Sequence, residues 1–323
     1  MSKLWKYHDK KMKELKSIYS RISRQTQNRL QEIFESMDFN FDNLYNIASK
    51  KTKDRIDVYI EEWKEKGLLT GYFGTLANSI YRRARVKNSE ILELLIYSAY
   101  IEEQSKIESK EQVIFEEIIS HYYQEGQVEV NKTLPRRKRK LISIIPDSIM
   151  LYIITMPSST GFLWKEYVDL MAKSNADQIY RQVIIDLQQQ KKPNINADIY
   201  QNIIKKQQNS KLCINDDKIS GVVDTSLIGM NNRAKIEGYK SVAGTDDVEV
   251  IFVAVGDERT TKMCMSLNGQ VFKVNGENSF TRYSAFNKSN IKYKCKGLVT
   301  GLNLPPITDH FHYCRSTVMY KRH

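Results

Sequence analysis

Apolar residues recur at steps of three and four along most of residues 3–242, and this spacing is the period of an amphipathic α-helix. The first such stripe runs from Leu4 to Met37, and the next is expected to be capped by Asp42 and ended by Gly67. The stripes are long but sometimes thin, which is typical of a helical bundle or an extended helical hairpin. Further helices are expected over 75–86, over 88–126 with a break near 105–109, and over 163–190, 196–208 and 219–242.

The middle of the chain has a less regular pattern. Residues 128–145 combine a short strand-like run, five consecutive basic residues and the sequence Ile-Ser-Ile-Ile. Residues 141–156 are mostly apolar and contain Pro146 and Asp147. This stretch is shorter than the roughly 20 residues that a membrane-spanning helix needs. We therefore expect a buried core segment with a turn here, and no association with a membrane.

The period of the pattern changes after Gly244. Residues 248–255 form a strand by composition, and shorter strands are expected over 270–274, 291–295 and 315–320. The expected fold class is therefore α+β, with a long, mainly helical N-terminal region followed by a small C-terminal α+β module that has a short sheet. The expected domains are a helical bundle or extended helical hairpin over 1–126, a mixed, mainly helical middle region with a basic loop at 135–140 over 127–215, and the α+β module over 216–323.

The chain is basic, with 50 lysine and arginine residues against 38 aspartate and glutamate residues and a formal net charge of +12. This balance favours an anionic partner, either nucleic acid or an acidic protein surface, although Lys-rich proteins with no nucleic-acid role share it. The densest basic run consists of Arg136, Arg137, Lys138, Arg139 and Lys140. This run is either a set of phosphate contacts or a solvated loop, and the lack of interleaved aromatic residues argues against base stacking.

Cysteine and histidine residues gather towards the C-terminus, where Cys264, Cys295, His310 and Cys314 could supply the four ligands of a tetrahedral zinc site. The sequence has no Cys-x-x-Cys pair, and this favours half-buried thiols and a structural histidine over a metal site. The N-terminus lacks the apolar segment of a signal peptide, so synthesis in the cytosol and reduced cysteines are expected. The sequence thus predicts no cofactor, with zinc as the alternative.

Asp257 and Arg259 follow the first expected strand, and Gly256 makes the turn between strand and pair. An Asp-x-Arg pair at such a turn is suited to a local salt bridge that fixes a loop. The alternative is a catalytic acid beside an anion-binding arginine. No dinucleotide-binding, P-loop, nucleophile-elbow or HExxH zinc motif occurs in the sequence, so enzymatic activity is not expected.

The order of short motifs in the last quarter of the chain resembles one known family. Residues 220–320 are in this respect similar to the phage Mu F-like minor head proteins, also described as phage head morphogenesis proteins. Thr261 and Phe311 depart from the family pattern, which has a cysteine and a histidine at these places, and both departures argue against a bound metal. The motif residues are Asp257 and Arg259, then Cys264, then Gly269 in a Leu-Asn-Gly turn, then Pro305 and Pro306, and finally His310, His312, Cys314 and Arg315.

The resemblance implies a virion protein of the phage head, made in the host cytoplasm and present in few copies. Its partners would be the portal protein, capsid or scaffold proteins, and packaged double-stranded DNA bound without sequence preference. Some members of the family enter the host with the genome. The expected function is non-catalytic head assembly, and the alternative is a metal-dependent nuclease or toxin-like effector that uses Asp257, Arg259 and His310 or His312.

Overall fold

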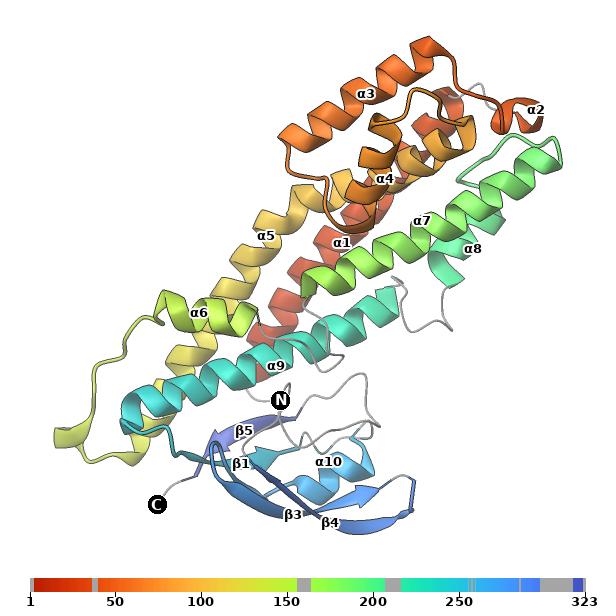
Figure 1. Cartoon of the computed structure of the whole chain (residues 1–323). Helices are drawn as coiled ribbons and strands as arrows, with labels where there is room; N and C mark the ends of the chain where they lie inside the picture. Colours follow the sequence, from red (N-terminus) through yellow and green to blue (C-terminus); the bar gives the residue numbers. More distant parts are fainter. Residues whose placement is uncertain are drawn as a thin grey trace. The chain divides into compact units, whose positions relative to one another are not determined.

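The computed structural model describes residues 3–36, 40–155, 164–206, 216–254, 256, 258, 260–284, 286–296 and 316–321. Long helices make up most of the described chain, and small antiparallel sheets follow them near the C-terminus (Figure 1). The α+β fold class expected from the sequence is confirmed. No helix in these ranges is both long enough and apolar enough to cross a membrane.

The elements are named in chain order. The helices are α1 (Lys3–Ser36), α2 (Phe41–Leu44), α3 (Lys50–Glu65), α4 (Gly71–Tyr81), α5 (Asn88–Thr133), the 3-10 helix η1 (Arg136–Lys138), α6 (Asp147–Ile154), α7 (Trp164–Gln188), α8 (Asp198–Lys206), α9 (Asp216–Ala243) and α10 (Lys262–Leu267). The strands are β1 (Glu249–Val253), β2 (Val271–Lys273), β3 (Glu277–Ser284), β4 (Ser289–Lys296) and β5 (Thr317–Tyr320). Most lie close to the expected positions, but η1, α6, α10 and β3 lie where the sequence pattern predicted no helix or strand.

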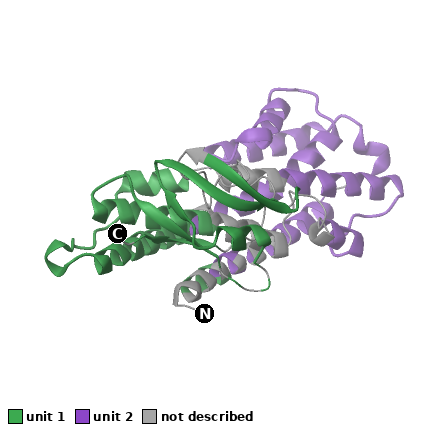
Figure 2. Cartoon of the chain, turned by 90° about the horizontal axis from the view of Figure 1, so that it is seen from below, with its two compact units in different colours: residues 1–13, 112–164, 220–323 green, residues 14–111, 165–219 purple. Residues whose placement is uncertain are grey.

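The chain forms two compact units, each built from segments that are separate in the sequence (Figure 2). Unit 1 comprises residues 1–13, 112–164 and 220–323, and unit 2 comprises residues 14–111 and 165–219. Helices α1, α5, α7 and α9 each contribute residues to both units. The three consecutive regions expected from the sequence therefore have other boundaries than the two units.

Unit 2 is held together by a helical core. Its largest buried side chains include Tyr97 and Tyr200, and Trp63 packs against Phe73 with ring centroids 5.2 Å apart. The Tyr200 hydroxyl donates to Asp186 at 2.7 Å, so the phenol is buried with its polar end satisfied. The core draws on α1, α3, α4, α5, α7 and α8 through residues that include Leu30, Phe34, Ile60, Trp63, Phe73, Ile80, Leu94, Tyr97, Ile179, Val183 and Tyr200.

The helix expected to begin at Asp42 is in fact two helices. Asn40 caps the short α2, because its side chain accepts from the Asn43 backbone N–H at 2.9 Å. Ser49 caps α3 in the same way, accepting from the Thr52 backbone N–H at 3.1 Å. The prediction of one helix capped by Asp42 is wrong because Ser49 supplies a second N-cap inside the apparent stripe.

Helix α5 is one continuous helix of 46 residues. The break expected near 105–109 is wrong: the Ser105 hydroxyl donates to the Glu102 carbonyl within the helix at 2.8 Å and does not interrupt it. The strand-like run expected after residue 127 is also helical. Its Val130 is completely buried in the core of unit 1, so tertiary packing overrides the β propensity of the valines.

Unit 1 contains a three-stranded antiparallel sheet of order β2-β1-β5, and β3 and β4 form a separate hairpin. The central position of Val250 on β1 places it opposite Phe272 on one side and Tyr320 on the other. The buried core of this unit combines the sheet with the ends of α5 and α9. It includes Val130, Ile236, Tyr239, Val242, Val248, Val250, Phe252, Leu267, Phe272, Phe280 and Val318.

Helices α5 and α9 cross at backbone distance. A Cβ atom built on Gly126 of α5 would lie 2.4 Å from the Lys235 carbonyl oxygen, and one on Gly238 of α9 would lie 2.2 Å from the Tyr123 carbonyl oxygen. Both distances are too short for any side chain. Glycine is required at each position because the partner atom is backbone, which cannot move aside as a side chain can.

We predict that Gly126→Ala lowers the free energy of unfolding by about 1–3 kcal/mol, although alanine is the better helix former, because the added methyl group forces α5 and α9 apart. Urea unfolding of the full chain measures the change. Gln124→Ala is the matched control, since Gln124 is exposed on the same helix. Equal stability of both variants and the wild type would contradict the close crossing.

Candidate nucleic-acid interface

The five-residue basic run leaves the end of α5 as an exposed loop. It begins after Pro135, and Arg136–Lys138 form the single turn η1. Residues 135–144 are all exposed, so the five basic side chains lie on the surface of unit 1. The sequence prediction of a basic loop at 135–140 agrees with this position, which leaves the cations accessible to a large anionic partner.

Side chains of α5 fix the backbone of this loop. Asn131 accepts from the Lys140 N–H at 3.1 Å and donates to the Lys140 carbonyl at 2.9 Å, so it mimics a strand partner. Gln127, which is completely buried, accepts from the Ser143 N–H at 2.9 Å and also donates to the hydroxyls of Ser143 and Ser241. The loop is therefore attached to both α5 and α9.

The cations of the loop have no acidic partner among the residues that the structure describes. The ion pairs of unit 1 lie elsewhere, for example Lys240 with Glu237 at 2.8 Å and Lys321 with Glu249 at 2.5 Å. Among the described contacts, the basic side chains of the loop donate only to backbone carbonyls, as when Lys140 Nζ donates to the Ser241 carbonyl of α9 at 3.4 Å. This uncompensated positive charge on a fixed backbone is suited to phosphate contacts.

The segment after the cations is apolar and exposed. Leu141 is 93% exposed, Ile142 53% and Ile144 82%. The expectation of a buried core segment over 141–156 is wrong for these residues. Burial resumes only at Ile145, because the polar partners that α5 offers at this place bind the loop backbone and leave the aliphatic side chains outside.

A buried polar cluster beneath the sheet holds the C-terminal strand. Lys235 of α9 is only 2% exposed, and its Nζ lies 3.4 Å from a Glu129 carboxylate oxygen and 3.3 Å from the Val318 carbonyl oxygen. Tyr239 donates to Glu129 at 2.8 Å, and the other oxygen of Glu129 accepts from the Tyr320 N–H at 2.8 Å. Burial raises the pKa of Tyr239 well above its usual range, and the charge of Glu129 adds to the shift.

Sequence reasoning missed this cluster. Lys235 is one of several polar residues in the sequence of α9, and polar residues of a helix are ordinarily expected to face solvent. No local motif marks its burial. Glu129 lies more than a hundred residues away on α5. The cluster connects α5, α9 and β5, and we interpret it as a structural clamp, because its polar groups are occupied by one another and by the strand backbone.

We predict that Glu129→Gln lowers the free energy of unfolding by about 3 kcal/mol, since it leaves the Lys235 ammonium buried without a counter-charge. Adding Lys235→Met should restore part of the loss. Chemical unfolding of the full chain measures both effects, with Glu277→Gln, at an exposed position of β3, as the control. A Glu129→Gln variant as stable as the control would show that the cluster does not clamp the strand.

The structure describes only part of the C-terminal motif set. Cys264 is buried in α10, and Gly269 makes a turn with φ of 80° while its N–H donates to the Phe252 carbonyl at 2.8 Å. Cys295 lies in β4 opposite Asn278, and nothing further is described of its side chain. The motif residues outside the described ranges are Asp257, Arg259, Pro305, Pro306, His310, His312, Cys314 and Arg315.

Thr261 has a clear local role. It is the N-cap of α10, and its hydroxyl accepts from the Cys264 backbone N–H at 3.2 Å. Threonine is therefore favoured at this position, where the Mu F-like family that the C-terminal motifs resemble has a cysteine. The described residues contain no group of three or more His, Cys, Asp and Glu side chains suited to a metal. The zinc alternative stays a prediction, because it depends on His310 and Cys314.

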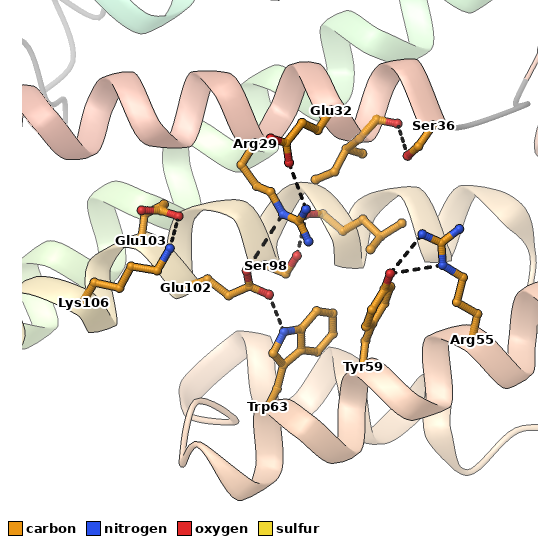
Figure 3. A network of polar contacts seen from close by, with 12 residues as sticks. Arg29, Glu32, Ser36, Arg55, Tyr59, Trp63, Ser98, Glu102, Glu103 and Lys106 are labelled. Atoms are coloured by element: carbon orange, nitrogen blue, oxygen red, sulfur yellow. Dashed lines mark hydrogen bonds and ion pairs between the residues drawn. The ribbon is translucent and has the colours of Figure 1, made fainter.

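Unit 2 has a separate cleft of about 600 Å³. Figure 3 shows Arg29 of α1 and Trp63 of α3 converging on Glu102 of α5. Arg29 donates to Glu32 at 3.1 Å and lies 4.0 Å from Glu102, while the Arg55 guanidinium donates only to the Tyr59 hydroxyl, at 3.0 and 3.1 Å, among the described contacts. The cleft has a mixed lining that includes Arg29, Glu32, Ile33, Lys51, Thr52, Arg55, Ile56, Tyr59, Ile91 and Leu95.

Comparison of the chain with protein-family models, with curated proteins and with solved structures gives no match.

Proposed function

We propose that this chain is a non-catalytic assembly protein that binds double-stranded DNA through the phosphate backbone. Within that class, the proposed role is that of a phage minor head protein, which joins the portal and the packaged DNA during head assembly. The observation that carries DNA binding is the exposed loop of five cations, fixed by Asn131 and Gln127 and free of acidic partners among the described residues.

Physical chemistry favours phosphate contacts at this loop over base recognition. Residues 134–146 contain no acidic and no aromatic residue, so the loop offers charge without a stacking platform. Because its backbone is bonded to α5, less conformational entropy is lost when the side chains meet phosphates. Binding should be independent of sequence and steeply dependent on salt.

The role in the phage head is supported by the order of the C-terminal motifs. The Asp257 to Thr260 sequence, the turn at Gly269 and the closing Pro305 to Arg315 segment follow one another as in Mu F-like minor head proteins. The net charge of +12 is compatible with packaged DNA as a partner. In this proposal the helical N-terminal region supplies the surface for portal or capsid proteins.

We expect duplex DNA of unrelated sequences to bind with similar affinity, and to lose affinity steeply as NaCl rises. Changing Arg136, Arg137, Lys138 and Arg139 to Gln should weaken binding at least ten-fold at low salt and reduce the log–log salt slope by about 3. Fluorescence anisotropy measures both quantities. The matched control changes four exposed cations of unit 2 to Gln and has the same net charge, namely Arg82, Arg85, Lys191 and Lys192.

Equal losses in the two quadruple variants would assign binding to overall charge and remove the loop from the interface. No binding by the wild-type chain at low salt would end the DNA part of the proposal.

The head role is tested by co-expression with the portal, scaffold and major capsid proteins of the genome that carries this chain. We expect the chain to co-purify with portal assemblies and procapsids, and mass spectrometry to detect it in virions. The loop variant should still enter procapsids, because portal association does not require the basic loop. Absence of the chain from procapsids and from virions would refute the head role, whatever the affinity of the chain for DNA.

A further inference from the structure

The apolar residues that follow the basic run are highly exposed to solvent. Leu141 and Ile144 are 93% and 82% exposed. They belong to the ten consecutive exposed residues 135–144, and the next residue, Ile145, is buried. Single exposed aliphatic residues are common on proteins, but two nearly bare ones beside Ile142, itself 53% exposed, form a small apolar projection.

The projection has a fixed backbone. Lys140 before it is bonded at both its N–H and its carbonyl to Asn131, and Ser143 within it is bonded through its N–H to Gln127. Gln127 is itself completely buried and reaches Ser241 on α9. The aliphatic side chains are therefore held away from unit 1 by the bonds of their neighbours. A segment held in this way is pre-organised for a partner.

We propose that Leu141 and Ile144 form a wedge that inserts between base pairs of the duplex held by the basic loop, so that binding bends the DNA. The inference rests on the proposed function, because it requires DNA at this loop. Proteins that kink DNA insert apolar side chains such as leucine and isoleucine at a base step and bend the duplex by roughly 20–90°. Arg139 and Lys140, directly before the wedge, would hold the phosphates that flank the opened step.

Charge and size favour DNA over an anionic membrane as the occupant. A duplex offers an apolar slot between bases within one nucleotide of its phosphates, which fits aliphatic residues next to cations in the chain. A planar lipid surface would also meet the exposed Asp147, three residues beyond Ile144, and the negative charge there opposes contact with anionic headgroups. A narrow wedge in a groove leaves Asp147 outside the contact.

The test uses the full chain and a 30-base-pair duplex labelled at both ends for fluorescence energy transfer. We expect wild-type binding to raise the transfer efficiency, and a duplex with a central TA step to bind several-fold tighter than one with a central A-tract, because TA steps kink easily. The Leu141→Ser/Ile144→Ser variant should keep the salt slope, lose less than ten-fold in affinity at low salt, and no longer bend the duplex. Leu151→Ser, 63% exposed on α6, is the control.

The outcomes separate the wedge from the proposed function. Binding without bending by the wild type, or equal bending by the double variant, overturns the wedge and leaves phosphate binding intact. No binding by the wild type ends the DNA part of the proposed function and the wedge with it. Vesicles that contain anionic phosphatidylglycerol are the second probe. If the wild type sediments with them, the double variant does not, and DNA bending is unchanged, the apolar residues belong to a lipid surface and the wedge is wrong.

Discussion

The backbone contact between α5 and α9 is the constraint on which the rest of unit 1 depends. Gly126 and Gly238 let each helix lie against the carbonyl oxygens of the other. At this separation Glu129 of α5 reaches Lys235 of α9, and both reach the backbone of β5. Since β5 pairs with β1, the helix crossing also fixes the sheet. A wider crossing would leave a buried ammonium and a strand edge without their partners.

The same crossing determines where the basic loop lies. Gln127 follows Gly126 directly, and its burial between the helices lets one amide bond Ser241 on α9 and Ser143 in the loop. Asn131, one helical turn later, holds Lys140. The cations are thus positioned by the close crossing of α5 and α9, although they are themselves exposed. A surface whose cations meet a partner's phosphates gains from such rigidity, because less ordering remains for the binding step.

Periodicity predicted the long helices and the first strand because their inward positions are apolar. It failed in β3, where most inward positions are polar. The buried positions of β3 are Asn278, Phe280, Arg282 and Ser284, of which only one is apolar, so the strand has no hydrophobic alternation to detect. Lys235 was missed for the same reason. A serine inside a helical stripe was ambiguous as well. Ser49 is the N-cap at which α3 begins, so it divides the apparent helix, whereas the Ser105 hydroxyl donates to a carbonyl of α5 and leaves that helix continuous.

The loop beyond Lys140 shows why burial cannot be assigned from hydrophobicity alone. An aliphatic run is buried only if the fold has an apolar surface left to cover it, and α5 presents Gln127 and Asn131 to this segment. The polar backbone therefore turns towards the protein, and Leu141 and Ile144 turn towards solvent, which is the reverse of the usual arrangement. Each exposed aliphatic side chain forgoes the free energy that burial would supply. That loss is recovered when another molecule covers the projection, and the five adjacent cations favour an anionic molecule at this place.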